Sequence, residues 1–129
     1  MNTTDKLPLG NFSVSLAVKN LERSLSFYQK LGFAVVSGDQ NKGWVVLLNG
    51  NARIGLFQGM FEKNILTFNP GWDAEKKMPA DFVDVRDIQK KLRGEGIEPA
   101  KSADESTNGP EHFMLVDPDG NEILVDQHV

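Results

Sequence analysis

The sequence predicts an α+β domain made of two similar halves, and three observations support this prediction. The first half shows the patterns of a strand, a helix and three further strands, in that order. The second half repeats part of this pattern when the sequence is shifted by 67 residues. The chain ends on two strand patterns joined by a tight-turn sequence. A length of 129 residues fits one domain of this kind, spanning residues 1–129.

The first predicted elements are a strand at residues 12–18 and the helix that follows it. Apolar side chains alternate with smaller ones along the strand, so one of its faces is apolar. Asn20 can cap the helix, because its side-chain oxygen can accept a hydrogen bond from a free backbone N–H of the first turn. The apolar stripe of the helix consists of Leu21, Leu25 and Tyr28. Gly32 is placed to end the helix.

Three strands are predicted after this helix. Residues 33–36 form the first of them, and residues 44–48 and 52–57 form the other two. The last two flank Asn49-Gly50-Asn51, and an Asn-Gly step between β-rich runs is a strong hairpin signal because it tolerates positive φ. The first module is therefore expected to be βαβββ and to span about residues 8–60.

The second module, about residues 79–129, is expected to follow the same order. Residues 82–85 are predicted as a strand and Asp87 as the cap of a helix. The helix is marked by an apolar stripe and two terminal glycines, namely Ile88, Leu92, Gly94 and Gly96. The shift of 67 residues places Val18 on Val85, Leu21 on Ile88 and Leu25 on Leu92.

A hairpin is predicted to close the second module. Residues 112–116 and 122–125 form its strands, and residues 117–121 form its turn. Pro118 suits the second position of such a turn, and Gly120 is free to take positive φ.

Residues 61–78 are expected to link the two modules. They carry many apolar side chains for a mobile linker, namely Phe61, Ile65, Leu66, Phe68 and Trp72. Two explanations stay open: these side chains pack across the join between the modules, or they line a ligand cleft or a subunit interface.

Composition and charge exclude several classes of function. The net charge is −4 and no basic cluster is present, so we expect no nucleic-acid partner. The absence of cysteine excludes disulfides and thiolate metal sites. Residues 1–10 hold no apolar run, and no segment approaches the roughly 20 apolar residues that span a bilayer. We therefore expect a cytoplasmic protein with neither a signal peptide nor a membrane partner.

Two motifs resemble those of a known family. The run from Ser15 to Tyr28, followed by Leu31-Gly32-Phe33, resembles the opening of glyoxalase, bleomycin-resistance and extradiol dioxygenase proteins of the vicinal oxygen chelate superfamily. The turn at residues 117–121, followed by Ile123, resembles the closing hairpin of that family. The resemblance implies two βαβββ modules whose mixed sheet curves as a half-barrel around a shared cleft, commonly in a homodimer.

In that superfamily the cleft often holds a divalent metal through four side chains, which come from the first and last strands of each module. The resemblance carries these positions onto Ser13, Gly55, Ala80 and Leu124. Three of the four offer no ligand atom and Ser13 offers only a neutral hydroxyl, whereas zinc, iron and manganese need imidazole or carboxylate ligands. We therefore expect no metal and no other cofactor.

Strand alternation then predicts which side chains face the cleft, because residues two apart share a face. The predicted lining consists of Ser13, Ser15, Arg53, Phe57, Phe82, Asp84, His112, Met114 and Leu124. An apolar floor with a few polar groups is typical of a small-molecule pocket. The facing of Trp44 and Trp72 stays open.

The charged members of this set also have simpler explanations. Arg53 can reach solvent with its charged end, and Asp84 can be a strand-end charge in water. His112 can be an exposed residue at the start of a strand.

Three functions are consistent with these patterns. The first is a metal-free protein that binds a small organic molecule in an apolar cleft, and an acidic surface would suit a cationic aromatic ligand. The second is a metal-independent enzyme that uses His112 or Asp84 as general base or acid. The third is a metal-dependent lyase, isomerase or dioxygenase. The sequence leaves open whether any reaction is catalysed.

Overall fold

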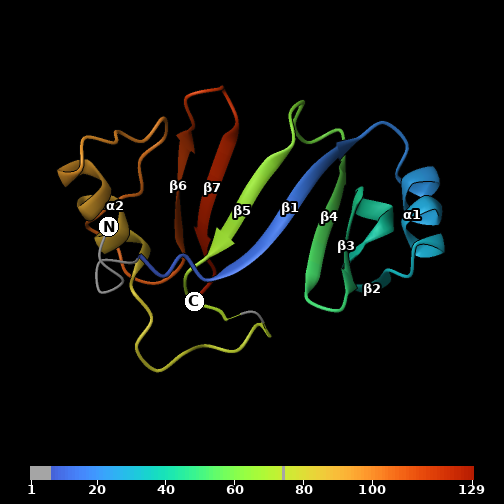
Figure 1. Cartoon of the computed structure of the whole chain (residues 1–129), viewed down its shortest axis with the longest axis horizontal. Coiled ribbons are helices and arrows are strands. Elements are labelled where there is room, and N and C mark those ends of the chain that lie inside the picture. Colours follow the sequence, from blue (N-terminus) through green and yellow to red (C-terminus); the bar gives the residue numbers. More distant parts are fainter. Residues whose placement is uncertain (1–6, 74) are drawn as a thin grey trace. The chain divides into compact units, whose positions relative to one another are not determined.

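The computed structural model describes residues 7–73 and 75–129 (Figure 1). Residues 1–6, which belong to the stretch where we expect no signal peptide, lie outside the described residues. The strands are hydrogen-bonded in the order β2-β3-β4-β1-β5-β7-β6 and form a mixed sheet. The α+β prediction is therefore confirmed. The chain divides into two compact units, one formed by residues 13–66 and the other by residues 67–129 together with residues 7–12.

The first unit has the predicted βαβββ order. Its elements are β1 (Asn11–Val18), α1 (Leu21–Lys30), β2 (Ala34–Asp39), the short 3-10 helix η2 (Gln40–Lys42), β3 (Trp44–Asn49) and β4 (Ala52–Gln58). β2, β3 and β4 form an antiparallel meander, and β1 pairs with β4 in parallel. Asn49 pairs with Ala52, which confirms the predicted hairpin.

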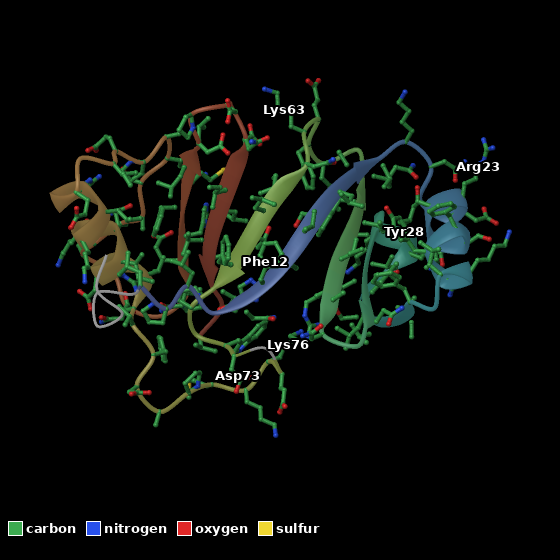
Figure 2. All side chains as sticks on the ribbon, viewed as in Figure 1. Phe12, Arg23, Tyr28, Lys63, Asp73 and Lys76 are labelled. Carbon is green, nitrogen blue, oxygen red and sulfur yellow. The ribbon has the colours of Figure 1, made fainter. Side chains whose placement is uncertain are left out.

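Helix α1 begins where the sequence predicts it. The Asn20 side-chain oxygen accepts a hydrogen bond from the backbone N–H of Arg23 at 3.0 Å, so the predicted cap is confirmed. Arg23 and Tyr28 both lie on this helix (Figure 2), and the Tyr28 ring meets the Phe33 ring edge-on. The first contact fixes the start of α1, and the second lies just beyond its end.

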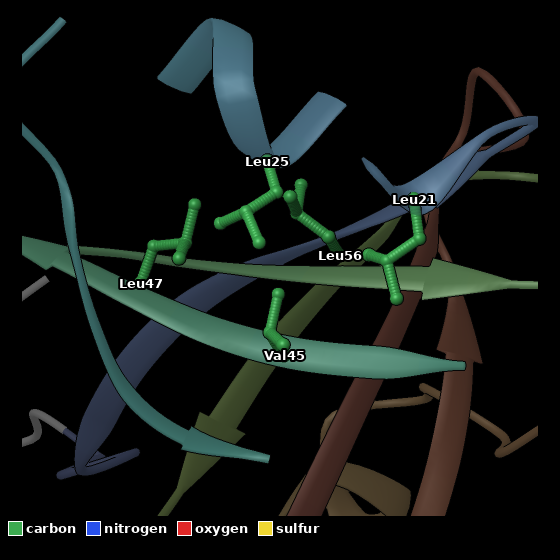
Figure 3. Close-up of a cluster of buried hydrophobic side chains, with 5 residues drawn as sticks. All are labelled: Leu21, Leu25, Val45, Leu47 and Leu56. Carbon is green, nitrogen blue, oxygen red and sulfur yellow. The ribbon is translucent and has the colours of Figure 1, made fainter. Parts of the chain in front are cut away.

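The core of the first unit lies between α1 and that face of the sheet. Figure 3 shows two leucines of α1 directed toward side chains of β3 and β4. The buried cluster consists of Leu21, Leu25, Val45, Leu47 and Leu56. Burial of this apolar surface is the main free-energy gain of the unit, and it fixes which face of β3 and β4 is turned away from α1.

The second unit differs from the predicted βαβββ order. Its elements are β5 (Ile65–Asn69), α2 (Val85–Gly94), β6 (Glu111–Val116) and β7 (Glu122–Gln127). β5 lies inside the segment expected as a linker, which accounts for much of that segment's apolar content. The place of a further strand beside β6 holds only an isolated bridge between Lys101 and Met114. The predicted closing hairpin is confirmed by the antiparallel pairing of β6 with β7.

The predicted strand at residues 82–85 is wrong, and so is the predicted helix cap. Val85 is the first residue of α2, and the Asp84 side chain accepts a hydrogen bond from the Arg86 backbone N–H at 2.9 Å. Asp84, and not Asp87, therefore caps the helix. A carboxylate that binds the first free N–H groups starts the helix at once, so the apolar residues before it do not continue as a strand.

The core of the second unit lies between α2 and the β6–β7 hairpin. It consists of Val85, Ile88, Ala103, Phe113 and Val125. Figure 1 shows α2 beside these two strands. Among the described residues, no helix is long and apolar enough to cross a membrane.

The two modules repeat one hydrogen bond that the sequence comparison did not predict. The Gln58 side-chain oxygen, at the end of β4, accepts from the backbone N–H of Leu21 at 2.7 Å. The Gln127 side-chain oxygen, at the end of β7, accepts from the backbone N–H of Val85 at 2.8 Å. Leu21 and Val85 are thus equivalent first residues of the two helices. The shift of 67 residues, which matched Val85 with Val18, is therefore wrong at the helix starts.

Candidate functional site

The face of β1, β3 and β4 that is turned away from α1 is the candidate site in the first unit. Strand pairing sets its composition, because residues paired across neighbouring strands share a face. Trp44 pairs with Phe57, Val46 with Gly55 and Leu48 with Arg53. On the other side of β4, Ser15 pairs with Gly55 and Ala17 with Phe57.

Three aromatic rings form a row on this face. The Trp44 and Phe57 rings are parallel within 3°, with centroids 6.0 Å apart. Phe61 lies just after β4 and places its ring 5.3 Å from that of Phe57. All three residues are half-buried, so part of each ring is open to solvent. We call these three residues the aromatic row.

Gly55 gives the Phe57 ring its position. A Cβ atom built on Gly55 would lie 2.5 Å from Cε2 of Phe57, which is far inside van der Waals contact. The ring is therefore folded back over the glycine and toward Arg53, two residues further along the same face. Any side chain at Gly55 would have to displace the ring.

Arg53 contributes an unusual polar atom to this face. Its Nε atom is buried and has no hydrogen-bond partner among the described residues. An N–H of a guanidinium normally finds an acceptor when it is buried, because the group stays charged and can only donate. The prediction that Arg53 lies on the same face as Phe57 agrees with the strand register.

Two predicted serines come from β1. Ser15 is buried and lies beside Gly55, and Ser13, two residues earlier, shares its face and is half-buried. Sequence alternation thus assigns the facing of both serines correctly within this unit, while their part in binding stays a prediction.

In the second unit three predicted residues share the face of the β6–β7 hairpin that is turned away from α2. Met114 pairs directly with Leu124, and His112 pairs with Asp126. Phe113 and Val125 occupy the opposite face and lie in the core. His112, Met114 and Leu124 are half-buried. The argument that turned Phe113 inward and His112 and Met114 outward therefore agrees with the register.

The alternation argument fails for Phe82 and Asp84, because no strand runs through them. Phe82 lies half-buried in the segment before α2. Asp84 caps α2 and its carboxylate pairs with the Arg86 guanidinium at 2.9 and 3.1 Å. Arg86 is itself buried and donates also to Thr107 and to the Gly109 carbonyl. Asp84 therefore belongs to a structural network at the start of α2.

The same network sets the ionisation of Asp84. Burial opposes the charged form, but hydrogen bonds from the Arg86 backbone N–H, the Gln127 amide and the Arg86 guanidinium, together with the guanidinium charge, outweigh burial and lower the pKa of the carboxyl. A carboxylate with a lowered pKa and three donors is a poor general base or acid near neutral pH.

Trp72 faces the end of the chain within the second unit. Its ring meets the His128 ring edge-on at 4.7 Å, and the Lys76 ammonium lies 4.6 Å from its centre. The His128 Nε2 atom is 2.9 Å from a carboxylate oxygen of Asp126. Figure 2 labels Asp73 and Lys76 in the loop that carries Trp72.

A polar hollow of about 450 Å³ lies at the start of α1. Its lining includes Lys19, Glu22, Gln40 and Gln58. Asn20 and Gln58 already accept two of the free N–H groups of α1 there, so the helix start offers fewer donors to a ligand. Because the hollow lacks an apolar floor, we regard the face that carries the aromatic row, called the aromatic face below, as the stronger candidate.

Two residues of the aromatic row were missed by the sequence analysis. Trp44 was left without a facing, and Phe61 was assigned to the linker. The facing of Trp44 follows from a two-residue turn at Gly50 and Asn51, because this turn pairs Trp44 with Phe57. The position of Phe61 had no such signal, since a loop conformation places its ring.

Comparison with known proteins identifies the family. Residues 12–125 match the family model described as Glyoxalase/Bleomycin resistance protein/Dioxygenase superfamily. The chain belongs to this superfamily. No curated protein sequence matches the chain.

Solved structures share the fold of this superfamily member. A glyoxalase/bleomycin resistance protein/dioxygenase superfamily member from Vibrio splendidus 12B01 is 16% identical, with a TM-score of 0.62 and coverage of 91% of this chain and 97% of that one. A protein named NAD-dependent benzaldehyde dehydrogenase from Legionella pneumophila is 18% identical, with a TM-score of 0.67 and coverage of 92% and 99%. A methylmalonyl-CoA epimerase in complex with methylmalonyl-CoA and NH4+ is 13% identical, with a TM-score of 0.55 and coverage of 96% of both chains. At these identities the likeness concerns the fold alone.

The residues of this superfamily member do not fit the metal site that the fold family implies. Gly55 lies under the Phe57 ring, and Leu124 offers no ligand atom. Ala80, carried over as a residue of the first strand of module two, lies on no strand, since β5 is that strand. β5 offers only a hydroxyl at Thr67 and an amide at Asn69 as side-chain donors. The described part of the chain holds no group of three or more His, Asp or Glu residues placed to bind an ion.

Proposed function

We propose that this superfamily member is a metal-independent binding protein for a small planar organic molecule. The observation that carries the proposal is the half-buried aromatic row on the face opposite α1. The ligand lies against the rings of Trp44, Phe57 and Phe61. Family membership supports a small-molecule role, and the geometry of this face supports a ligand with a flat, apolar ring.

Physical arguments favour this face for such a ligand. Aromatic side chains have large apolar surfaces and little rotamer entropy to lose, so they bind rings at low entropic cost. Ala17, which pairs with Phe57, is small and half-buried, so its side chain covers little of the row. Apolar walls with a few polar groups are the usual lining of ligand sites.

Fluorescence of Trp44 tests the proposal directly. The chain holds two tryptophans, so a Trp72→Phe variant leaves Trp44 as the single reporter. Planar aromatic compounds should change its emission saturably, and Phe57→Ala in that background should weaken binding by roughly tenfold or more, which corresponds to about 1.4 kcal/mol.

A matched substitution on the other side of the first unit provides the control. Phe27 is 59% exposed on α1, and Phe27→Ala removes the same ring without touching the aromatic row. Equal affinities of the Phe57→Ala and Phe27→Ala proteins, or no saturable response to any planar compound, would contradict the proposal.

A metal-independent enzyme is the second candidate. It is favoured by the short contact between His128 and Asp126, because a carboxylate that binds one ring nitrogen orients the imidazole. Turnover of a bound ligand that is lost in His128→Gln, with binding retained, would support this candidate. The hypothesis that pairs His112 with Asp84 is weaker, because Arg86 and Gln127 hold the Asp84 carboxylate.

We also propose that the protein forms a homodimer. Large apolar side chains exposed on the first unit support this, namely Leu31, which caps the C-terminal end of α1, and Val35 and Val36 of β2. Sedimentation equilibrium should give twice the chain mass, and Leu31→Glu should shift the protein toward the monomer. A monomer at all protein concentrations would refute the homodimer.

A further inference from the structure

The unpaired Nε of Arg53 points to the chemistry of the ligand. This atom is buried on the same face as the aromatic row and has no acceptor among the described residues. Only the Nε side of the guanidinium is covered, whereas its terminal nitrogens are not among the buried atoms without a partner and can reach solvent, as the sequence analysis considered. A buried donor without an acceptor is uncommon in folded proteins, and a bound ligand is one way to satisfy it.

The position of Arg53 suits a ligand that also touches the aromatic row. Arg53 and Gly55 are two residues apart on one strand, so their Cα atoms are roughly 6.6 Å apart. The Phe57 side chain folds back over Gly55, so its ring lies closer to Arg53 than the Phe57 backbone does. One planar molecule can thus touch the Phe57 ring and reach the guanidinium with a substituent at its edge.

The charge on this face restricts the substituent. Among the residues of β1, β3 and β4 that share the face, Arg53 is the only charged one. A guanidinium donates and never accepts, and its planar fork matches the two oxygens of a carboxylate. The remaining side chains of the face are apolar rings, aliphatic groups, serines, one asparagine and glycine, so none of them competes for the guanidinium by charge.

We infer that Arg53 is the specificity-determining residue of the site and selects planar aromatic ligands that carry a carboxylate. This inference rests on the proposed function and names its ligand class. It differs from the cationic ligand that the net charge of the chain favours, because the local charge on the binding face is positive. The carboxylate accepts the hydrogen bond of the Arg53 Nε, and the ring lies against the aromatic row.

A matched pair of probes tests the inference. 2-Naphthoate carries a carboxylate, and 2-naphthalenemethanol has the same ring system without the charge. ¹H–¹⁵N NMR titration of the wild-type protein should show the Arg53 Nε–H signal moving downfield with 2-naphthoate only. The affinity for 2-naphthoate should exceed that for the alcohol by roughly tenfold or more, as expected for a charge-assisted hydrogen bond.

Variants separate this inference from the proposed function. Arg53→Met should bring the two affinities together, and Arg53→Lys should keep part of the preference because it keeps the charge. Arg23→Met is the matched control, since Arg23 is exposed on α1, away from this face (Figure 2). We expect the Arg23→Met protein to bind both probes with the same affinities as the wild type.

The other outcomes overturn the inference in distinguishable ways. Equal binding of both probes to the wild type, lost in Phe57→Ala, would refute the role of Arg53 and leave the binding face intact. An unchanged Arg53 Nε–H signal with bound 2-naphthoate would do the same. Binding of neither probe would refute the carboxylate preference and would count against the aromatic face as well.

Discussion

Single residues determine how the candidate face is built. Gly55 allows the Phe57 ring to approach the strand closely, and Trp44 stacks on the same ring from the neighbouring strand. Arg53 places a buried donor beside them. Gly55, the position to which the resemblance assigns a metal ligand, thus lies beside an aromatic ring.

Gly55→Ala should weaken ligand binding without changing the fold. The new methyl group must displace the Phe57 ring, at a cost of about 1–3 kcal/mol for overpacking, lower if the ring rotates freely. Binding of planar ligands should weaken by roughly tenfold, while the circular dichroism spectrum should stay unchanged. Gly94→Ala is the matched control, because no atom lies within 4 Å of the added methyl group there. Undiminished binding by Gly55→Ala would contradict the role of the ring.

The ionisation of Asp84 predicts a pH dependence of stability. The folded state lowers the pKa of Asp84 below its ordinary value of 3.8, so the stabilisation is present above that value and is lost as the pH falls through the lowered pKa. Urea unfolding between pH 6 and about pH 2 should show a smaller loss of stability for Asp84→Asn than for the wild type. Asp81→Asn, at an exposed position three residues earlier, should keep the wild-type profile. Identical profiles for all three proteins would exclude this contribution.

At the scale of elements, each module ties its helix to its last strand through a glutamine. Gln58 is exposed, so water can replace its bond to Leu21. Gln127 is 1% exposed and also donates to Asp84, to the Gly109 carbonyl and to the Val129 carbonyl. We therefore expect the equivalent hydrogen bond to contribute more to the free energy of unfolding in the second module than in the first.

Substitution of the two glutamines should reveal this difference. Gln127→Leu leaves several buried groups without partners, and we expect it to lower the free energy of unfolding by about 2–4 kcal/mol. Gln58→Leu should lower it by less than about 1 kcal/mol, because the freed N–H can bond to water. Chemical unfolding followed by circular dichroism measures both values. Equal losses would show that burial does not distinguish the two sites.

At the scale of the whole molecule, the chain keeps the superfamily fold, and its described residues hold no group of three or more His, Asp or Glu placed to bind an ion. The family model matches residues 12–125, which include all described strands except the first residue of β1 and the last two of β7. Those strands present glycine, serine, threonine and leucine at the relevant places. Hydroxyls and apolar groups do not hold zinc, iron or manganese stably.

Metal analysis tests this conclusion on the intact protein. Plasma mass spectrometry of the purified chain should find zinc, nickel, manganese and iron well below one atom per chain. Dialysis against a chelator should leave the affinity for planar ligands unchanged. A stoichiometric metal whose removal abolishes binding would overturn the proposed metal independence.

The sequence alone determined the parts of the fold that depend on local patterns. These are the elements of the first module, the cap at Asn20 and the closing hairpin, because capping, helical periodicity and turn chemistry act within a few residues. It also determined that Phe113 is a core residue, since strand alternation is local as well.

Tertiary structure decided the features that depend on partners distant in sequence. β5 is a strand because it forms backbone hydrogen bonds in the sheet. Its sequence alone is equally consistent with a linker. α2 starts at Val85 because Asp84 and Gln127, 43 residues apart, both bind its first turn. The burial of the Arg53 Nε and the stacking of Trp44 on Phe57 likewise require strand pairing. Long-range hydrogen bonds and packing outweigh local propensity at these positions. The candidate site is built largely from residues at such positions.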